Sequence, residues 1–353
     1  MRVIGLMSGT SLDGVDAALV ETDGETIHAF GPALTVAYPA GLRAELRALL
    51  DRASSLEAYD PVLTRVTARL SEVHAEAVAT LNVPAELIGF HGQTILHDPA
   101  RGRTWQIGDA AALARATGLP VAWDFRSADV AAGGQGAPLA PLFHAALAAS
   151  LPNPLCVLNL GGVANLTFVD DGKLLACDAG PASGPIDDWV SARTGAAFDV
   201  DGRLALSGTV ATDVLGRLMG DPFFAMPAPK SLDRLHFADR IAASGLASLS
   251  DADGAATLVA WIAAAVAAIP LPKLPGCWLV TGGGRRNAAI MAALRGRLGA
   301  VEPVEAVGWD GDALEAQCFG YLAVRVARGL PLSLPETTGV PHPMPGGRIT
   351  RPA

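Results

Sequence analysis

Two strand–glycine turn–strand units, about a domain's length apart, place the strongest constraint on how this chain can fold. In the first, an apolar strand over residues 2–6 leads through a turn that contains Gly9 into a strand over 15–21. In the second, a strand over 156–160 leads through a turn that begins at Gly161, 152 residues after Gly9. The repeat predicts an internally duplicated α/β protein, with chance repetition of a common hairpin as the alternative.

The rest of the chain alternates helical and extended patterns. Helices are predicted over 42–50, 62–81, 139–149, 287–298 and 312–328, and further strands over 88–95, 166–169, 174–177 and 277–280. Residues 133–138 are rich in glycine and proline, which interrupt regular secondary structure. This stretch is therefore a candidate domain junction. A length of 353 residues also favours about two domains.

The chain is acidic and rich in glycine. It has 35 Asp and Glu against 26 Lys and Arg, a formal net charge of −9, and 39 glycines. This balance argues against a nucleic-acid or anionic-membrane partner, since either needs a basic face. It does not exclude an anionic ligand such as ATP, because backbone N–H groups in glycine-rich turns can bind phosphates.

The chain has the features of a cytoplasmic protein. Its first apolar stretch is too short for a signal peptide. The longest apolar run, residues 255–269, is shorter than the ~20 residues that a membrane helix needs, and it ends at Pro270. The four cysteines form no CxxC pair, which favours buried, reduced thiols.

The turn at residues 9–16 combines glycine, hydroxyl and carboxylate groups. It has G-x4-G spacing, but it lacks the Lys-Ser/Thr pair of a P-loop and leads into a strand rather than a helix. Such a turn can surround phosphate oxygens with N–H groups while a carboxylate holds hydrated Mg²⁺. A plain hairpin with turn-favouring residues is the alternative.

A second glycine-rich segment, residues 281–287, lies between a predicted strand and a predicted helix. Its three consecutive glycines exceed what a turn needs and would let a ligand approach a helix start, where negative charge is favoured. A tight strand-to-helix loop is the alternative. The sequence favours a loop that faces a nucleotide.

Polar residues at strand ends are candidates for catalysis and binding. Asp178 follows a strand in a Gly-Pro turn and is placed to act as a general base, with a turn aspartate as the alternative. Asp187 and Asp188 are interpreted as helix-start residues. Candidates for binding a polyhydroxylated ligand, each with local turn polarity as the alternative, are His91, Gln93, Gln106, Asp109, Asp124, Arg126, Asp129 and Gln135.

In their order along the chain, these motifs resemble those of the anhydro-N-acetylmuramic acid kinase family. The long and specific matches are residues 5–16 and 133–139. The other matches are residues 89–94, 106–109, 124–126 with Asp129, 158–162, Asp178 with 180–181, 229–231 and 282–284. The resemblance covers nearly the whole chain.

The resemblance implies an α/β fold of two similar actin-like (ribonuclease H-like) domains with a central cleft for ATP. Residues 1–130 and about 311–353 would form the N-terminal domain with the first phosphate hairpin. Residues 131–310 would form the second domain, with the second phosphate hairpin, the catalytic aspartate and the adenosine loop. The partners implied are a sugar and ATP, with neither nucleic acid nor membrane, and a homodimer is allowed.

The reaction implied is that of an ATP-dependent kinase in peptidoglycan recycling. It opens 1,6-anhydro-N-acetylmuramic acid hydrolytically and phosphorylates O6, giving N-acetylmuramic acid 6-phosphate and ADP. Asp178 would be the catalytic base, and Asp13 would hold Mg²⁺ through water. ATP would be bound by Gly9, Thr10, Ser11, Leu12, Asp13, Gly14, Val15, Asp16, Gly161, Gly162, Gly282, Gly283 and Gly284. The sugar would be bound by His91, Gln93, Asp124, Arg126, Asp129, Gln135 and Glu315.

The chain departs from the family pattern near the expected sugar site. Ser183 stands where the family has Asn, and Leu232 and Asp233 stand where the family has Thr-Gly. Two alternatives therefore stay open. One is a catalytically silent, nucleotide-responsive binding protein on the same fold, and the other is a kinase of another sugar.

Overall fold

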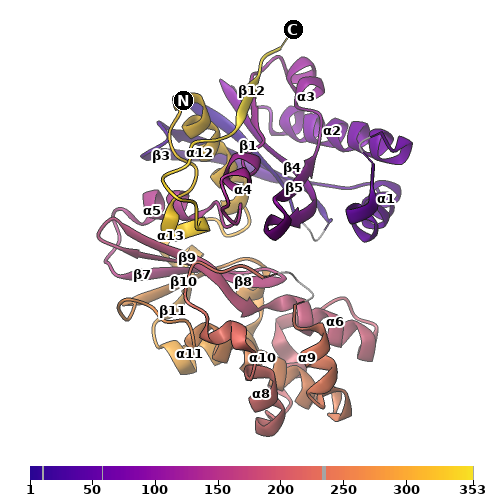
Figure 1. The fold of residues 1–353 in the computed structure, drawn as a ribbon, viewed down its shortest axis with the longest axis vertical. Coiled ribbons are helices and arrows are strands. Elements are labelled where there is room, and N and C mark those ends of the chain that lie inside the picture. The colour runs from indigo at the N-terminus through magenta and orange to yellow at the C-terminus, as the bar shows by residue number, and fades with distance from the viewer. Residues whose placement is uncertain (10–11, 58, 233–235, 353) are drawn as a thin grey trace. The chain divides into compact units, whose positions relative to one another are not determined.

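The computed structural model describes residues 1–9, 12–57, 59–232 and 236–352. They form two compact units (Figure 1). Unit 1 comprises Met1–Ala149 and the C-terminal segment that begins at Ala313, and unit 2 comprises Ser150–Asp312. Each unit is built on its own mixed β-sheet with helices, so the predicted α/β class is confirmed.

Within the described residues, unit 1 carries a seven-stranded sheet of order β12-β6-β4-β1-β2-β3, with β5 paired to β4. Its strands are β1 (Arg2–Ser8), β2 (Gly14–Thr22), β3 (Ile27–Ala37), β4 (Leu87–Asp98), β5 (Arg103–Ile107), β6 (Val121–Trp123) and β12 (Arg348–Thr350). Its helices are α1 (Ala40–Asp51), η1 (Ala53–Ser55), α2 (Pro61–Leu81), η2 (Pro99–Arg101), α3 (Ala110–Thr117), α4 (Ser127–Ala131), α5 (Pro141–Ala148), α12 (Leu314–Arg328) and α13 (Pro335–Thr338), where η marks a 3₁₀-helix.

Unit 2 carries a sheet of order β11-β10-β7-β8-β9. Its strands are β7 (Leu155–Leu160), β8 (Val163–Asp170), β9 (Lys173–Pro181), β10 (Cys277–Thr281) and β11 (Val301–Pro303). Its helices are α6 (Ser183–Thr194), η3 (Val200–Gly202), α7 (Arg203–Leu206), α8 (Thr212–Met219), η4 (Pro222–Ala225), α9 (Ala238–Ala243), η5 (Leu246–Ser248), α10 (Asp251–Ala267), η6 (Gly283–Arg286), α11 (Ala288–Leu298) and η7 (Val304–Val307). The predicted helices and strands are all present in the two units.

The two sheets repeat one topology, which confirms the predicted duplication. In unit 1, β1, β2 and β3 form an antiparallel meander, and β4 and β6 continue from β1 as parallel strands. In unit 2, β7, β8 and β9 form the same meander, and β10 and β11 continue from β7 in parallel. Each glycine turn therefore joins the first two strands of its own sheet.

Local signals in the sequence set the ends of the long helices. Helix α2 begins after Asp60, whose side chain accepts hydrogen bonds from the backbone N–H groups of Val62 and Leu63 at 2.8 and 3.1 Å. It ends at Asn82, which adopts a left-handed conformation. Helix α6 begins at Ser183, so Asp187 and Asp188 lie in its second turn, and their interpretation as helix-start residues was wrong.

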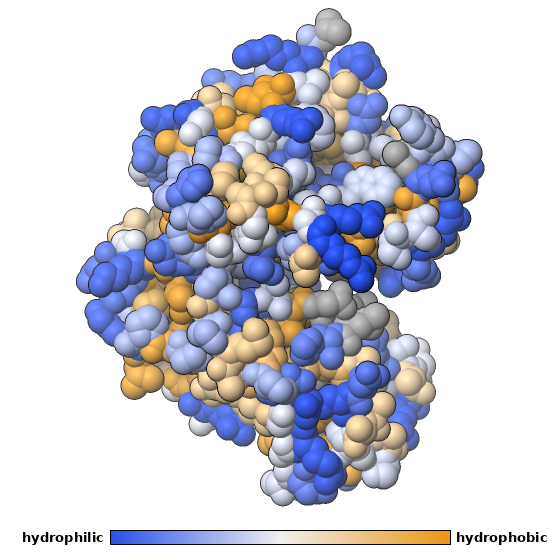
Figure 2. Space-filling view, in the orientation of Figure 1, coloured by the Kyte–Doolittle hydropathy of each residue, from blue (hydrophilic) through white to orange (hydrophobic). Residues whose placement is uncertain are grey.

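The helices of unit 2 lie on one side of its sheet (Figure 1). Helix α10 supplies much of the core between them and the sheet, and its Trp261 is fully buried. This helix contains most of the longest apolar run of the sequence. None of the helices in the described ranges is long and apolar enough to cross a membrane. On the face drawn in Figure 2, apolar residues lie in separate groups among hydrophilic ones.

Helix α12 packs closely on one face of the unit 1 sheet because glycines line the contact. A Cβ atom on Gly5 would lie 1.7 Å from the carbonyl oxygen of Ala316, and one on Gly89 would lie 2.0 Å from that of Phe319. The side chains of Ile4 and Leu6 point to the opposite face, where they are buried with residues of α1 and α2. The central strands of unit 1 are thus covered on both faces.

We predict that Gly5→Ala lowers the free energy of unfolding by about 3 kcal/mol or more, because the added methyl group would overlap the backbone of α12. Urea or thermal unfolding measures the change. The matched control is Gly41→Ala in α1, where a Cβ would meet only an Arg69 nitrogen at 3.9 Å. That variant should gain up to about 1 kcal/mol. Equal stability of the two variants would contradict the close packing of α12.

Candidate active site

The loop after β10 packs against the end of β7 in unit 2. The two strands pair in parallel, so their carboxyl ends, followed by Gly161 and Gly282, lie at the same edge of the sheet. A Cβ atom on Gly282 would lie 2.4 Å from Oδ1 of Asn159, and one on Gly284 would lie 2.6 Å from Cβ of Leu160. The structure therefore brings together two of the three glycine segments that the sequence predicts to face a nucleotide.

At three positions on this edge, neither the backbone conformation nor the neighbouring atoms require glycine rather than another residue. None of Gly161, Gly162 and Gly283 has a positive φ. A Cβ atom would meet nothing within 4 Å at Gly162 or Gly283, and only an ordinary contact at 3.8 Å at Gly161. Glycine at such positions is expected where a ligand must approach the backbone closely.

Backbone hydrogen bonds connect the first turn of α6 to the turn after β7. The backbone N–H of Ser183 donates to the carbonyl oxygen of Gly161 at 2.9 Å, and that of Gly184 donates to Gly162 at 3.3 Å. The oxygen of the Ser183 side chain lies beside Gly284, whose Cβ would be 3.2 Å from it. Ser183 thus holds the second glycine turn through a backbone contact that does not depend on its side chain.

Asp178 lies in a row of polar residues that crosses the unit 2 sheet. It pairs in register with Asn165 on β8, which pairs with Asn159 on β7, which in turn pairs with Thr281 on β10. Side chains in register on adjacent strands point to the same face of a sheet. The residues that precede or follow them in these strands, Cys177, Leu166, Leu158 and Val280, belong to the unit 2 core. The polar row therefore faces away from that core, beside the glycine turns.

The carboxyl group of Asp178 is held by the segment 230–232. The backbone N–H of Leu232 donates to Oδ2 of Asp178 at 2.6 Å, and the N–H of Asp178 donates to the carbonyl oxygen of Lys230 at 2.9 Å. Burial raises the pKa of Asp178 to about 7, against the opposing effect of the Leu232 hydrogen bond. Such a carboxyl group can take up and release a proton near neutral pH.

Lys230 anchors this segment in the protein interior. Its side chain is 5% exposed, and Nζ donates to the carbonyl oxygen of Phe223 at 2.9 Å and lies 4.3 Å from the centre of the Phe223 ring. Burial lowers the pKa of Lys230. The family-like motif at 229–231 therefore fixes the backbone that holds Asp178. Leu232 supplies its N–H whatever its side chain, and Asp233 lies outside the described residues.

The first glycine turn, in unit 1, is described except for Thr10 and Ser11. Leu12 has a φ of +57°, its side chain is buried, and its N–H donates to the carbonyl oxygen of Gly9 at 3.3 Å. Val15 is also a core residue. Asp13 carries an exposed carboxylate, and Asp16 accepts a hydrogen bond from Thr35 at 2.6 Å. A Cβ atom on Gly14 would lie 2.3 Å from the carbonyl oxygen of Val36.

Gln93 is hydrogen-bonded to the first glycine turn. Its side chain is fully buried, Nε2 donates to the carbonyl oxygen of Gly9 at 3.2 Å, and Oε1 accepts from the hydroxyl group of Ser8. Ser8 also shares a hydrogen bond with the hydroxyl group of Tyr38, whose pKa burial raises. The hydrogen bonds of Gln93 thus connect it to the predicted phosphate turn.

His91 and Arg126 form a buried pair in unit 1. Nε of Arg126 donates to Nε2 of His91 at 3.1 Å, so the proton of the neutral imidazole is on Nδ1, which lies 2.8 Å from the carbonyl oxygen of Gly92. Burial and the Arg126 charge hold the pKa of His91 well below its usual value. Burial also lowers the pKa of Arg126 to about 10, and the nearby charge of Glu315 opposes this shift. At neutral pH the pair is an uncharged imidazole beside a guanidinium cation.

Beside this pair lies a cavity of about 240 Å³. Its lining is Phe90, His91, Gly92, Thr104, Trp105, Gln106, Ile107, Gly108, Trp123, Asp124 and Ser127. This mixture of aromatic surface with a few polar groups is typical of sites for small molecules. Of these residues, His91, Gln106 and Asp124 were predicted from the sequence. Trp105 and Trp123 were not, although each of them directly precedes a predicted polar residue.

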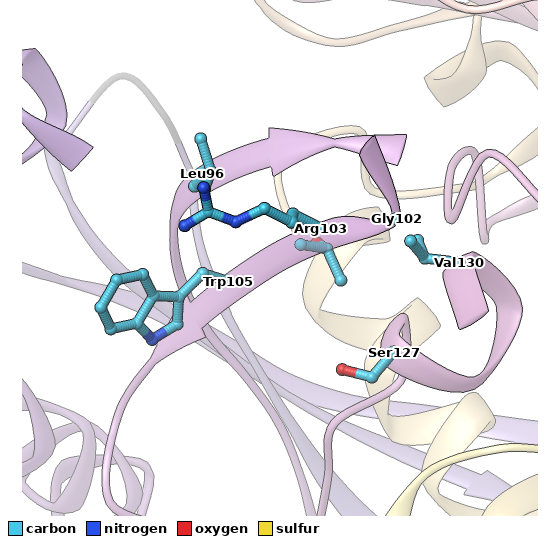
Figure 3. A pocket seen from close by; sticks show the side chains of 7 residues that line it. Leu96, Gly102, Arg103, Trp105, Ser127 and Val130 are labelled. Carbon is cyan, nitrogen blue, oxygen red and sulfur yellow. The ribbon is translucent and has the colours of Figure 1, made fainter. Parts of the chain in front are cut away.

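A second hollow of about 270 Å³ shares Thr104, Trp105 and Ser127 with the first. Figure 3 shows it between the β4–β5 hairpin, which carries Arg103 and Trp105, and α4, which carries Ser127 and Val130. Residues of β5 line both hollows. The first hollow is lined by His91 and Asp124, two of the predicted sugar residues of unit 1.

Asp129 and Gln135 bind a neighbouring loop and the C-terminal segment. Asp129 is 2% exposed, and its carboxylate accepts hydrogen bonds from the N–H of Gly136 at 2.6 Å and from the hydroxyl groups of Thr338, at 2.6 Å, and Ser333. The N–H of Gln135 donates to the carbonyl oxygen of Thr338 at 2.7 Å. Asp129 therefore has a full set of protein partners.

The chain matches known proteins along its whole length. A family model described as anhydro-N-acetylmuramic acid kinase matches residues 1–352. The anhydro-N-acetylmuramic acid kinase of Acidiphilium cryptum is 66% identical over 100% of this chain and 99% of its own length. Those of Gluconobacter oxydans and Rhodospirillum rubrum are 52% and 53% identical over 98% of this chain, and over 98% and 92% of their own lengths. This chain belongs to the anhydro-N-acetylmuramic acid kinase family.

Membership of the anhydro-N-acetylmuramic acid kinase family confirms the predicted enzyme class, a phosphotransferase. It does not favour the alternative of a catalytically silent binding protein. The match runs through both units, so it covers the glycine turns, Asp178 and the unit 1 cavity alike. Two of the three departures from the family pattern, at Ser183 and Leu232, fall where the structure uses backbone N–H groups.

We predict that Asp129→Asn lowers the free energy of unfolding by about 2–4 kcal/mol, because an amide group would face three hydrogen-bond donors in a buried site. Chemical denaturation measures the loss. The control is Asp124→Asn, at a position with a φ of +61° that Asn tolerates and a partly exposed ion pair with Arg348. A variant with unchanged stability but a raised KM for the sugar would instead make Asp129 a sugar ligand.

Proposed function

We propose that this chain opens 1,6-anhydro-N-acetylmuramic acid with water and transfers the γ-phosphoryl group of ATP to O6, giving N-acetylmuramic acid 6-phosphate and ADP. Family membership supports the reaction, and Asp178 is the observation that carries it. This carboxyl group is half-buried, accepts one backbone hydrogen bond and has a pKa of about 7. Those are the properties of a general base that works near neutral pH.

The proposed reaction uses Asp178 to activate the nucleophile. Asp178 accepts a proton from water while the water oxygen forms a bond to C1 of the sugar. The bond between C1 and O6 breaks, and O6 forms a bond to the γ-phosphorus as ADP leaves. Attack by water is most favourable from the face of the ring opposite the bridge oxygen, as in glycoside hydrolysis with inversion. The proton on Asp178 returns to solvent after the step.

The glycine turns are the proposed sites for the phosphates and adenosine of ATP. Gly161, Gly162 and Gly283 leave room for a ligand against the backbone, and Gly282 and Gly284 pack against the end of β7. The first turn, residues 9–16, would contribute further N–H groups. Backbone N–H groups bind phosphate without a basic side chain, which suits an acidic protein.

The donor groups at the first turn fit Mg²⁺ bound together with ATP. Asp13 presents an exposed carboxylate, the hard oxygen ligand that Mg²⁺ prefers. Within the described ranges, no three His, Cys, Asp or Glu side chains are grouped to hold a metal ion by themselves. We propose an ion held by the Asp13 carboxylate, water and phosphates, where it would neutralise phosphate charge.

The unit 1 cavity is the proposed binding region for the sugar. Its aromatic side chains and the imidazole ring of His91 offer ring surface, while Gln106 and Asp124 offer hydrogen bonds to hydroxyl groups. Arg126, held by His91 and by the carbonyl oxygen of Gly136 at 2.7 Å, keeps the imidazole orientation fixed. Because the reaction consumes ATP, we also infer that the protein acts in the cytoplasm.

We predict that Asp178→Asn lowers kcat by roughly 10²–10⁴-fold and leaves ATP affinity unchanged, because an amide group cannot accept the proton. ADP release with and without the anhydro sugar measures turnover, and calorimetry measures ATP binding. The matched control is Asp171→Asn, in the turn between β8 and β9, where a φ of +47° suits Asn. Full activity of Asp178→Asn would remove Asp178 from the mechanism. ATP binding by the native chain without any sugar phosphate would favour the silent binding protein.

We predict that kcat/KM falls as the pH decreases through about 7, because Asp178 becomes protonated and can no longer accept a proton. At pH values above 7 the carboxylate is ionised and activity reaches a plateau. Initial rates of ADP release at low sugar concentration give the profile, and constant ATP affinity over the same pH range is the control. A plateau that extends well below pH 7 would show that the carboxylate has an ordinary pKa.

A further inference from the structure

Asn165 is the neighbour of Asp178 in the unit 2 sheet. The two residues pair in register on β8 and β9, which places their Cβ atoms roughly 5 Å apart on one face. The pairing shifts at this point, because Ala164 pairs with Gly180 while Asn165 pairs with Asp178. Ala179 is therefore the extra residue of a β-bulge. Bulges of this kind redirect side chains beside active sites.

The side chain of Asn165 has unused hydrogen-bonding capacity. It is half-buried, and in the described part of the chain its amide group makes no hydrogen bond to protein. The other members of the polar row differ: Thr281 bonds to the carbonyl oxygen of Gly311 at 3.5 Å, and Asn159 has a partner of its own. A half-buried amide without a protein partner, beside a half-buried carboxyl group, indicates a site for a small polar ligand.

Water is the ligand that fits the chemistry of this pair. Oδ2 of Asp178 already accepts the N–H of Leu232, which leaves Oδ1 to receive a proton. A water molecule that attacks through a lone pair gives one O–H to the base and needs an acceptor for the other O–H. The amide oxygen of Asn165 lies on the same face of the sheet and can be that acceptor.

We infer that Asn165 and Asp178 together bind the attacking water, with Asp178 as the base and Asn165 as the residue that orients the second O–H. The inference rests on the proposed function, since it concerns the nucleophile of that reaction. One proton of the water passes to Asp178 while the oxygen bonds to C1 and the C1–O6 bond breaks. The second proton stays on the new C1 hydroxyl group, still bonded to Asn165 in the product.

A competing nucleophile tests this role directly. Methanol has one O–H for Asp178 and none for Asn165, so the native chain should prefer water. With the anhydro sugar and ATP in water–methanol mixtures, the products are N-acetylmuramic acid 6-phosphate and its methyl glycoside, which mass spectrometry separates. Asn165→Ala should lower kcat and raise the methyl glycoside share roughly five- to ten-fold, the effect of one lost hydrogen bond, with the KM for ATP unchanged.

A second variant gives an independent readout. Asn165→Asp keeps an acceptor but adds a negative charge beside Asp178, which should shift the acid limb of the kcat/KM profile to higher pH while preserving the preference for water. An unchanged product ratio in Asn165→Ala, or a raised KM for ATP with that ratio unchanged, would overturn the inference. An unshifted profile in a folded Asn165→Asp protein would do so as well. If the native chain forms no sugar phosphate at all, the proposed function fails instead.

Discussion

The parallel pairing of β7 with β10 is the constraint on which the unit 2 site depends. It brings the strand ends before Gly161 and Gly282 to one edge of the sheet, so two glycine segments 121 residues apart become neighbours. The antiparallel strands β8 and β9 then extend the same row to Asp178. A slip of β9 by one residue would turn Asp178 into the apolar core and bring Cys177 to its place. The core that fixes this register therefore also fixes the position of the base.

The raised pKa of Asp178 depends on the position of the Lys230 ammonium group. Lys230 is close in sequence to the segment that holds Asp178, yet its ammonium group bonds to the carbonyl oxygen of Phe223. An ion pair with Lys230 would lower the pKa of the carboxyl group and make it a weaker base. Instead burial raises that pKa to about 7, and a single backbone N–H from Leu232 opposes the effect. Lys230 acts on the site through the backbone that it anchors.

Much of the fold follows from local patterns, because apolar periodicity and glycine turns depend on residues close in sequence. The duplicated hairpins and the predicted helices were of this kind. Asp178 was expected directly after a strand, but it lies within β9, which continues to Pro181. The contacts of Gln93 and Asp129 were not of this kind. Gln93 is buried beneath Gly9, and Asp129 meets Ser333 and Thr338 more than 200 residues later. A polar residue next to a strand looks the same in sequence whether its partners are ligands or distant parts of the protein.

At two positions where this chain departs from its family pattern, the structure uses the backbone and not the side chain. Ser183 holds the turn after β7 through its N–H, and Leu232 holds Asp178 through its N–H. Any residue except proline supplies that donor, so neither substitution removes the contact that the structure uses. The side chains at both positions are free to differ while the glycine turn and the base stay in place. By this reasoning, a proline at position 232 would disturb the site more than the loss of the family's threonine does.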